Sequence, residues 1–454
     1  MSQQTDRALS ELIEWVKMPS HKTEPESMRE AAHFCARLLK EAGFTVRFVG
    51  SPEAPAIIAR INPDAPKTLL FYSHYDVVAP GDEGAWTHPP FSGHVEDGVL
   101  HGRGSSDHKA TFIARLEAVR RLLKSGELPL GIAFLIEGDE ELGSRGLEQI
   151  IIDNRDMLTA SGGLYSGGAR TETGKPVIRA GGKGQIAIHL TVQLSNRDNH
   201  SKWAAIAPNP GWRLVAALNT LYDGDRDQLL TKGFLESALP PNAADEAALA
   251  KLNFDVDAFL KSSGHKRLRA DAQADPLRTL LFVPTFNIAW LRSGPGSSTV
   301  LPGTASAMLD LRLVPGQTAR GAEQTVRDHL ASHGFGDVLI EVSKGSEPEK
   351  CDLDDLVIQS LYAAAVKVHG ECDVYPMGPG SGPRYLFARH LGCSLVQDPG
   401  CSWSGSNDHA ANENIMIEHF QQNIDLIEAF LRDYARRCAD GGSAPSLGGA
   451  TNNV

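Results

Sequence analysis

The chain has 454 residues, of which 41% are hydrophobic and 22% charged, a composition typical of a globular protein with about two domains. Its formal net charge of −12 disfavours nucleic acid and an anionic membrane surface as partners, because both attract basic proteins. No apolar run reaches the ~18 residues of a membrane span, residues 1–14 lack a secretory signal, and the six cysteines show no C-x-x-C spacing. A cytoplasmic location is therefore expected.

The first part of the chain alternates between helix and strand. Apolar residues recur at helical spacing in three segments, and short apolar runs bounded by polar residues predict three strands. The two most apolar runs favour strands that are buried on both faces. This alternation predicts an α/β fold, a mixed sheet flanked by helices. The predicted helices cover residues 8–18, 27–42 and 111–124, and the predicted strands cover residues 44–49, 68–73 and 131–137.

The middle of the chain has a different pattern. Residues 185–194 and 304–314 alternate cleanly between apolar and polar, as in strands with one buried face. We expect a smaller α+β domain over residues 183–342, inserted into a larger domain of residues 1–182 and 343–438. The Gly/Ser-rich tail, residues 439–454, is predicted to be disordered.

Acidic residues and histidines gather in four segments, two of them directly after buried strands. Ligands of open α/β sheets bind beyond the carboxyl ends of the strands. Each segment alone is weak, because a single histidine or aspartate there is more often a capping or surface residue. The segments are Phe71–Val78, Gly102–Lys109, Glu137–Ser144 and Ser406–Asn414.

In combination, the four segments indicate a hydrolytic metal site. Two histidines and several carboxylates supply the nitrogen and oxygen ligands that suit zinc, manganese or cobalt. A metal that lowers the pKa of water, with a carboxylate to accept its proton, forms a complete hydrolytic device. Glu140 beside Glu141 offers such a spare carboxylate.

The same segments resemble the H-x-D-V, G-R-G-x-x-D-x-K, E-E-x-G-S and H-x-P-N-E-N motifs of a known family. This is the metallopeptidase and amidohydrolase family of carnosinase, aminoacylase and succinyl-diaminopimelate desuccinylase. The resemblance runs from about residue 5 to residue 435 and implies a zinc-exopeptidase-like catalytic domain with a lid and dimerisation domain. Further matches are His200-Ser201, Asn209-Pro210, Asn287-Ile288, Arg312–Pro315 and Ser381–Pro383.

The resemblance also implies a metal-ligand set. Asp107 would bridge two metal ions, with Glu141 and His409 completing one site. His74 would serve the other site. Asp76 would orient His74, as carboxylates behind metal-binding histidines commonly do.

Other roles implied by the resemblance concern proton transfer and substrate binding. Glu140 would be the general base that deprotonates the attacking water. His200 would reach a neighbouring subunit's site and stabilise the oxyanion, which makes a homo-oligomer, a dimer or larger, expected. The implied contacts to a small-molecule substrate are Asn287, Arg312, Ser381 and Gly382, and Arg170 is a further candidate for substrate binding.

One departure from the family pattern concerns a further aspartate ligand, because Gly167 stands where relatives have it. In one interpretation the alignment has slipped, or Glu172 or water fills the gap. In the other, only one metal binds tightly, either at Asp107, Glu141 and His409 or in a hybrid site with His74. Arg170 could place its guanidinium near the vacated cation position.

The leading interpretation is a metal-dependent hydrolase of a C–N bond in a small amide, a dipeptide or an N-acyl amino acid. An alternative is a single-metal aminohydrolase that releases ammonia from an aromatic amine such as a nitroanthranilate. A non-catalytic binding protein is a third possibility, but it would not need the base Glu140. The remaining histidines of the 16 are expected mostly on the surface or in satisfied hydrogen bonds.

Overall fold

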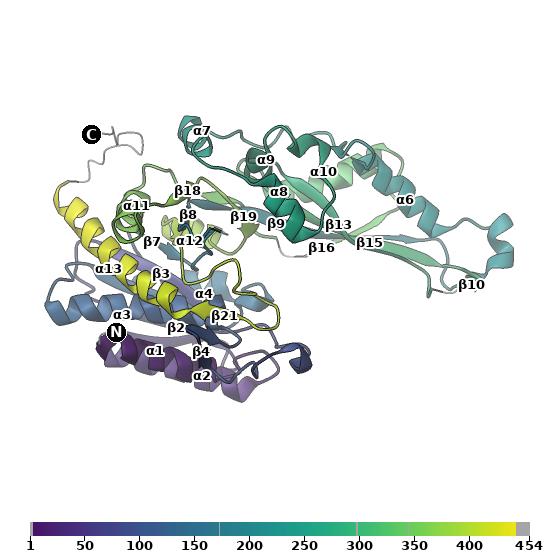
Figure 1. The fold of residues 1–454 in the computed structure, drawn as a ribbon. Coiled ribbons are helices and arrows are strands. Elements are labelled where there is room, and N and C mark those ends of the chain that lie inside the picture. Colours follow the sequence, from purple (N-terminus) through teal and green to yellow (C-terminus); the bar gives the residue numbers. More distant parts are fainter. Residues whose placement is uncertain (1–2, 172, 297, 344, 442–454) are drawn as a thin grey trace. The chain divides into compact units, whose positions relative to one another are not determined.

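The structure is a computed structural model that describes residues 3–171, 173–296, 298–343 and 345–441. It divides into two compact units (Figure 1). The first comprises Met1–Gly181, Cys351–Pro376 and Leu386–Val454, and the second comprises Gly182–Lys350 and Met377–Tyr385. Residues 442–454, most of the tail predicted to be disordered, lie outside the described residues.

The second unit takes in two stretches that the sequence analysis assigned to the catalytic domain, residues 343–350 and 377–385. The reason is strand pairing. Strands β17 (Glu349–Lys350) and β19 (Gly378–Ser381) both pair with β9 (Gly181–Gln193), which belongs almost entirely to this unit. Such short strands carry too little hydrophobic pattern to be assigned from sequence.

The first unit is built on an eight-stranded mixed sheet in the order β1-β2-β6-β3-β7-β20-β8-β18. Its centre is parallel, with β3 between β6 and β7, whereas β1, β2 and β6 pair antiparallel. Every residue of β3 and β6 is buried, which explains their uninterrupted apolar runs. The strands are β1 Thr45–Gly50, β2 Pro55–Ile61, β3 Thr68–His74, β6 Gly131–Glu137, β7 Gly162–Tyr165, β8 Val177–Arg179, β18 Asp373–Tyr375 and β20 Leu395–Gln397.

Helices flank this sheet. Helix α13 packs against α3 and α11, and α1 also packs against α3. Helix α3 begins directly after the segment that contains Asp107, so the packing of α3 positions that segment. The helices are α1 Gln3–Val16, α2 Pro25–Glu41, α3 Ala110–Ser125, α4 Leu147–Asp153, α5 Arg155–Leu158, α11 Leu356–His369, α12 Tyr385–Leu391 and α13 Ile417–Ala439.

A small antiparallel sheet of three short strands completes the first unit, in the order β21-β5-β4. Its strands are β4 (His94–Glu96), β5 (Val99–His101) and β21 (Asn414–Met416). Strand β5 runs directly into the segment that carries Asp107, and β21 directly follows Glu413. This small sheet therefore joins two of the four sequence segments.

The second unit has an antiparallel sheet in the order β13-β15-β9-β16, with helices on one face. Buried residues of β9 and β15 alternate with half-buried ones and pack against α6 and α10, which explains the period-2 pattern of the sequence. The longer elements are α6 Pro210–Leu221, α7 Ala243–Leu249, α8 Val256–Ser263, α9 Pro276–Phe282, β13 Thr285–Ser293, β15 Thr304–Leu313, α10 Ala319–Ser332 and β16 Leu339–Val342. Besides β17, the two-residue strands are β10 Asn199–His200, β11 Tyr222–Asp223, β12 Gln228–Leu229 and β14 Val300–Leu301.

The predicted fold class, a mixed α/β sheet flanked by helices with a smaller α+β unit, is confirmed. Among the described residues, no helix combines the length and the apolar character that crossing a membrane requires.

Candidate metal centre

The carboxylate of Asp107 lies between two histidines. Its Oδ1 is 3.0 Å from His74 Nε2, and its Oδ2 is 2.9 Å from His409 Nε2. His74 is the last residue of β3, and β6 runs parallel to it with Glu137 in the paired position. Three of the four sequence segments thus meet at one end of the parallel strands, where ligands of α/β sheets bind.

The segment Glu137–Ser144 contributes Glu141, whose Oε1 lies 3.2 Å from His409 Nε2. Ligand atoms of His74, Asp107 and Glu141 all lie within 4.8 Å of one another. This grouping combines His74 with Glu141, as the hybrid arrangement considered from the sequence does. One imidazole and two carboxylates, with a second imidazole adjacent, form a donor set that suits a divalent transition metal.

Asp76 connects the two sides of this group. Its backbone oxygen lies 3.0 Å from His74 Nδ1, and its Oδ1 lies 3.5 Å from the same nitrogen. Its Oδ2 accepts a hydrogen bond from the backbone N–H of Glu141 at 2.9 Å. Asp76 therefore fixes the ring of His74 and the backbone of the glutamate segment, as a residue behind metal ligands does.

The charges in this group are strongly coupled. Burial alone would lower the pKa of His74, but its hydrogen bonds to Asp107 and Asp76 outweigh burial and hold that pKa well above its usual range. Burial opposes ionisation of Asp107, yet His409 and His74 hold the pKa of its carboxyl well below the usual range. Hydrogen bonds to Asp107 and Glu141 raise the pKa of His409 to about 10. A cation between these groups would meet an ionised carboxylate.

Glu140 begins a short 3-10 helix, Glu140–Leu142, directly beside Glu141. Burial raises the pKa of its carboxyl to about 7; His74 opposes this rise, whereas Asp107 and Glu141 add to it. A carboxylate with a pKa near neutrality can both accept and return a proton, which is the requirement for a general base.

Glu413 holds the Asp107 segment in place, a role that the sequence analysis did not assign. It is fully buried, and Arg103 Nη1 donates to its Oε2 at 2.7 Å. The backbone N–H groups of Gly104, Ser106 and Asp107 also donate to it, at 3.0, 2.9 and 3.1 Å. Burial raises its pKa to about 7, but these donors favour the ionised form. Two sequence motifs could have indicated this role: the N-E-N motif that contains Glu413 and the G-R-G-x-x-D-x-K motif that contains its hydrogen-bond donors.

Gly167, the position where an aspartate ligand was expected, is tightly packed. A Cβ atom there would lie 2.8 Å from both Gly400 Cα and Thr111 Oγ1. The Gly167 carbonyl oxygen lies 3.2 Å from Nε2 of His108, a buried residue that the sequence analysis also missed. Burial, together with the nearby charge of His74, lowers the pKa of His108 to about 3, so its ring is neutral.

Arg170 is buried, and its Nη1 lies 3.5 Å from the carbonyl oxygen of Gly174. Burial, with Arg170 as a further cause, lowers the pKa values of His369 and His419 to about 4. Those histidines belong to α11 and α13. These contacts give no support to the expected position of Arg170 beside the metal ligands, and residue 172, the other candidate, lies outside the described residues.

The remaining predicted residues belong to the second unit. Arg312 Nη1 donates to Ser381 Oγ at 3.1 Å, so these two predicted substrate contacts lie together, and Gly382 follows directly in the chain. Asn287 is exposed on β13. His200 is also exposed, and its Nδ1 accepts a hydrogen bond from the backbone N–H of Lys202 at 3.1 Å.

A family model described as "Peptidase family M20/M25/M40" matches residues 70–433, which include every predicted metal ligand. The chain belongs to this peptidase family. Two relatives of the chain support the resemblance found in the sequence. The human Beta-Ala-His dipeptidase is 27% identical over 95% of this chain and 90% of its own length. A Cys-Gly metallodipeptidase of Candida albicans is 26% identical over 90% of this chain and 91% of its own.

Solved structures of this peptidase family agree. An M20 family metallo-carboxypeptidase from Sulfolobus solfataricus is 32% identical, with a TM-score of 0.88 over 96% of this chain and 99% of that one. Human carnosine dipeptidase 1 is 26% identical, with a TM-score of 0.77 over 95% of this chain and 96% of that one. This M20-type chain is therefore a metal-binding hydrolase of C–N bonds that acts on small molecules. Relatives that are peptidases lend no support to the aromatic-amine alternative.

Proposed function

We propose that the protein is a dipeptidase and that N-acyl amino acids are a second, less favoured class of substrate. The observation that carries this proposal is Asp107 between His74 and His409, with Glu140 and Glu141 on the adjoining segment. Two dipeptidases among the relatives support the choice of substrate, since each matches this chain over nine-tenths of its length or more.

His74, Asp107, Glu141 and His409 would hold the metal, and the donor set favours zinc, manganese or cobalt. Bound there, such an ion supplies a Lewis acid that polarises the scissile carbonyl and lowers the pKa of water. We expect one ion to bind tightly, because Gly167 supplies no carboxylate to a second position.

The chain's own residues would then move the proton and hold the geometry. Glu140 accepts a proton from the attacking water and returns it to the departing amine, for which its pKa of about 7 is suitable. Asp76 keeps the ring of His74 and the backbone of Glu141 in register. Glu413 fixes the backbone on which Asp107 stands.

In the second unit, Arg312 would bind the substrate carboxylate, assisted by Asn287, Ser381 and Gly382. Arginine suits this role because its planar guanidinium makes paired hydrogen bonds to a carboxylate. A dipeptide ends in such a carboxylate.

His200 would stabilise the oxyanion in a neighbouring subunit's site, so we propose a homodimer. The segment after His200 presents three large apolar side chains to solvent, Trp203, Ile206 and Trp212, with exposed fractions of 48%, 80% and 76%. Exposed apolar groups of this size are typical of protein–protein interfaces. A second copy of the chain would cover these side chains, and His200 would then reach the active site of that copy.

The proposal is tested with chelator-stripped protein that is reloaded with zinc, manganese or cobalt and assayed on three substrate panels. We expect turnover of dipeptides above that of N-acyl amino acids and no release of ammonia from aromatic amines. Elemental analysis of protein purified without chelator should give about one ion per chain at the hydrolytic centre, counted as the difference between wild type and Asp107→Asn. Turnover that is confined to aromatic amines, or that is unchanged after stripping, would overturn the proposal.

A further inference from the structure

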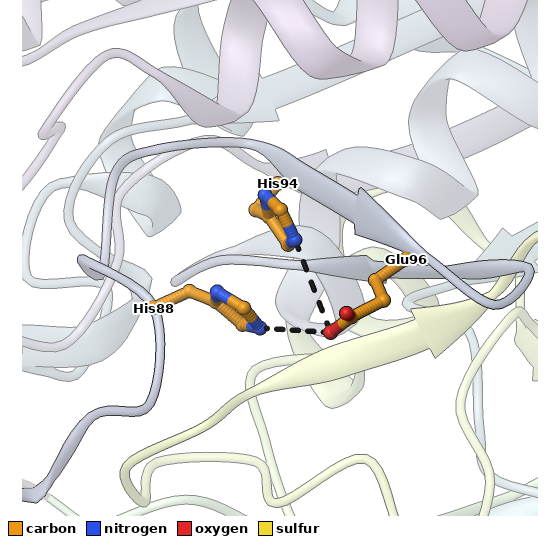
Figure 2. Close-up of side chains that lie close together, drawn as sticks. All are labelled: His88, His94 and Glu96. Atoms are coloured by element: carbon orange, nitrogen blue, oxygen red, sulfur yellow. Dashed lines mark ion pairs between the residues drawn. The ribbon is translucent and has the colours of Figure 1, made fainter.

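A second group of metal-type ligands lies on the first unit, in the small sheet. Ligand atoms of His88, His94 and Glu96 all lie within 4.8 Å of one another. Figure 2 shows a nitrogen of each imidazole ring facing the same carboxylate oxygen of Glu96. None of these residues belongs to the sequence segments that carry the proposed active site, and together they form what we call the peripheral cluster.

The distances within the peripheral cluster are short. Glu96 Oε2 lies 3.4 Å from His88 Nε2 and 4.0 Å from His94 Nε2. The rings of His88 and His94 stack with centroids 3.9 Å apart. His101 adjoins them, with its ring centroid 5.0 Å from that of His88 and 6.3 Å from that of His94. Two imidazoles and one carboxylate therefore face the same small volume, and the ring of His101 lies beside them.

The backbone explains why these side chains meet. His94 and Glu96 are two residues apart on β4 and so share one face of the sheet. His101 is paired directly with His94 across β4 and β5, which brings its side chain to the same face. His88 comes from the preceding loop.

That loop is itself fixed by Asn412. The backbone N–H of Thr87 donates to Asn412 Oδ1 at 2.7 Å, and Asn412 Nδ2 donates to Ala85 O at 3.2 Å. The loop that carries His88 is thus held on both sides of Trp86, so His88 is presented to β4 by a fixed backbone.

The chemistry of the peripheral cluster favours a cation of the imidazole-binding type. Protonated imidazoles in stacking contact repel one another. Three adjacent histidines therefore stabilise the fold little unless a cation is bound between them. Burial and the charges of His88 and His94 lower the pKa of His101, which keeps it available as a neutral ligand. His94 and Glu96 are 42% and 60% exposed, so an ion can enter from solvent, while His88 is only 21% exposed.

We propose that His88, His94 and Glu96, with His101 as a fourth ligand, form a second, peripheral site for a divalent transition metal. Three histidines and a carboxylate suit tetrahedral zinc, and nickel or copper would also bind such imidazoles. The site is separate from the hydrolytic centre in its residues.

Because of where the peripheral cluster lies, a metal ion bound there would also stabilise the structure around it. His101 is the last residue of β5 and precedes the segment from Gly102 to Asp107. An ion bound to β4, β5 and the His88 loop would cross-link them next to that segment. Metal binding at the peripheral cluster should therefore stabilise the folded protein, since an ion that binds only the native state raises its unfolding temperature.

The test is a zinc titration of the full-length protein against a chromophoric competing chelator. Wild type is compared with the double variant His88→Gln/His94→Gln, and His33→Gln serves as the matched control because His33 is exposed on α2 of the same unit. We expect the double variant to bind one zinc equivalent fewer than wild type and the His33→Gln variant to bind as many. Turnover at saturating metal should stay within about twofold of wild type.

Two further measurements separate this site from the hydrolytic centre. The variant Asp107→Asn should lose the zinc of that centre and retain the peripheral equivalent. In wild type, excess zinc should raise the unfolding temperature by more than it does in the double variant. Equal zinc stoichiometry in wild type and the double variant, both folded by circular dichroism, would overturn the proposal even if the hydrolytic activity is as proposed.

Discussion

His108 Nε2 lies 3.2 Å from the carbonyl oxygen of Gly167, and a carbonyl can only accept, so the ring N–H donates. The neutral imidazole of His108 is thus hydrogen-bonded to the residue that lacks the expected carboxylate side chain, Gly167. His108 Nδ1 is buried with no hydrogen-bond partner among the described residues, and its ring centroid is 5.2 Å from that of His74. The position where an aspartate ligand was expected therefore accepts, through its backbone carbonyl, a hydrogen bond from a buried and neutral histidine.

The substitution Gly167→Asp should not restore a second metal ligand. Its Cβ would lie 2.8 Å from Gly400 Cα, a backbone atom that cannot move independently. We expect a loss of about 1–3 kcal/mol in the free energy of unfolding and no gain in bound metal, measured by urea denaturation and elemental analysis.

Gly167→Ala is the matched control, since it adds the same Cβ without a carboxylate. The two variants should lose similar stability. A Gly167→Asp protein that is as stable as wild type and holds one more ion per chain would show that the position can still serve as a ligand.

Replacement of Glu140 by Gln should reduce kcat by about 10²- to 10⁴-fold, because the amide cannot accept the proton of the attacking water. Metal content should stay at the wild-type level, since Glu141 and not Glu140 belongs to the ligand group. Steady-state kinetics on a dipeptide and elemental analysis measure the two quantities.

Glu127→Gln, on an exposed glutamate of the same unit, is the control and should leave both quantities unchanged. If Glu140→Gln keeps wild-type turnover, the proton is transferred by another group and the proposed mechanism is wrong.

The buried carboxylate of Glu413 should contribute strongly to stability. In Glu413→Gln the amide would place a donor among N–H groups that now all donate to Glu413, and it would leave the Arg103 guanidinium buried without its counter-charge. We expect a loss of about 3–5 kcal/mol in the free energy of unfolding. Metal affinity should fall as well, because the Asp107 N–H is one of these donors.

Urea denaturation and zinc competition measure these effects, and Glu418→Gln on the exposed face of α13 is the control. Should Glu413→Gln match the control in both measurements, the Asp107 segment does not depend on this carboxylate.

The sequence predicted the features that depend on local pattern. The apolar run at residues 68–73 became β3 (Thr68–His74) almost unchanged. The strand-end rule indicated that the four segments meet, and the family resemblance selected His74, Asp107, Glu141 and His409 within them, which lie close together in the structure. Buried strands have continuous apolar runs, and parallel strands bring their carboxyl ends to one edge, so both inferences rest on strong constraints.

The features that the sequence did not predict depend on pairing between distant residues. His94 faces His101 only because β4 and β5 pair in this register, and the packing against Gly167 needs Gly400 from 233 positions along the chain. Neither contact leaves a period in the sequence. Arg170 likewise was only one candidate for the vacated cation position, and its neighbours on α11 and α13 could be known only from the fold.

Arg312→Lys should raise KM for dipeptides by about 10- to 100-fold, which corresponds to the loss of a charged hydrogen bond of about 1.5–3 kcal/mol. Lysine keeps the charge but cannot make paired hydrogen bonds to a carboxylate. Because this contact would exist in both the bound substrate and the transition state, kcat should change much less than KM.

The same dipeptides with a C-terminal amide provide the internal control, since they lack the carboxylate and should not distinguish Arg312→Lys from wild type. Arg327→Lys on α10 controls for a general effect of the substitution. If amide and acid substrates respond alike, Arg312 does not bind the substrate carboxylate.

His369 and His419 should make the folded protein sensitive to mild acid. Burial, with the charge of Arg170 as a further cause, lowers both pKa values from 6.5 to about 4. Between these values the unfolded chain binds protons that the folded chain does not, so stability is fully present above about pH 6.5 and is lost as pH falls towards 4.

The measurement is the free energy of unfolding from urea denaturation at several pH values, for wild type and for His369→Gln/His419→Gln. The difference between the two proteins isolates these histidines from the other titrating groups, including the hydrolytic centre. We expect wild type to lose more stability than the double variant between pH 6.5 and 4. His33→Gln, which removes an exposed histidine of α2, should follow wild type throughout. Parallel curves for all three proteins would mean that the two buried rings titrate alike in the folded and unfolded chain.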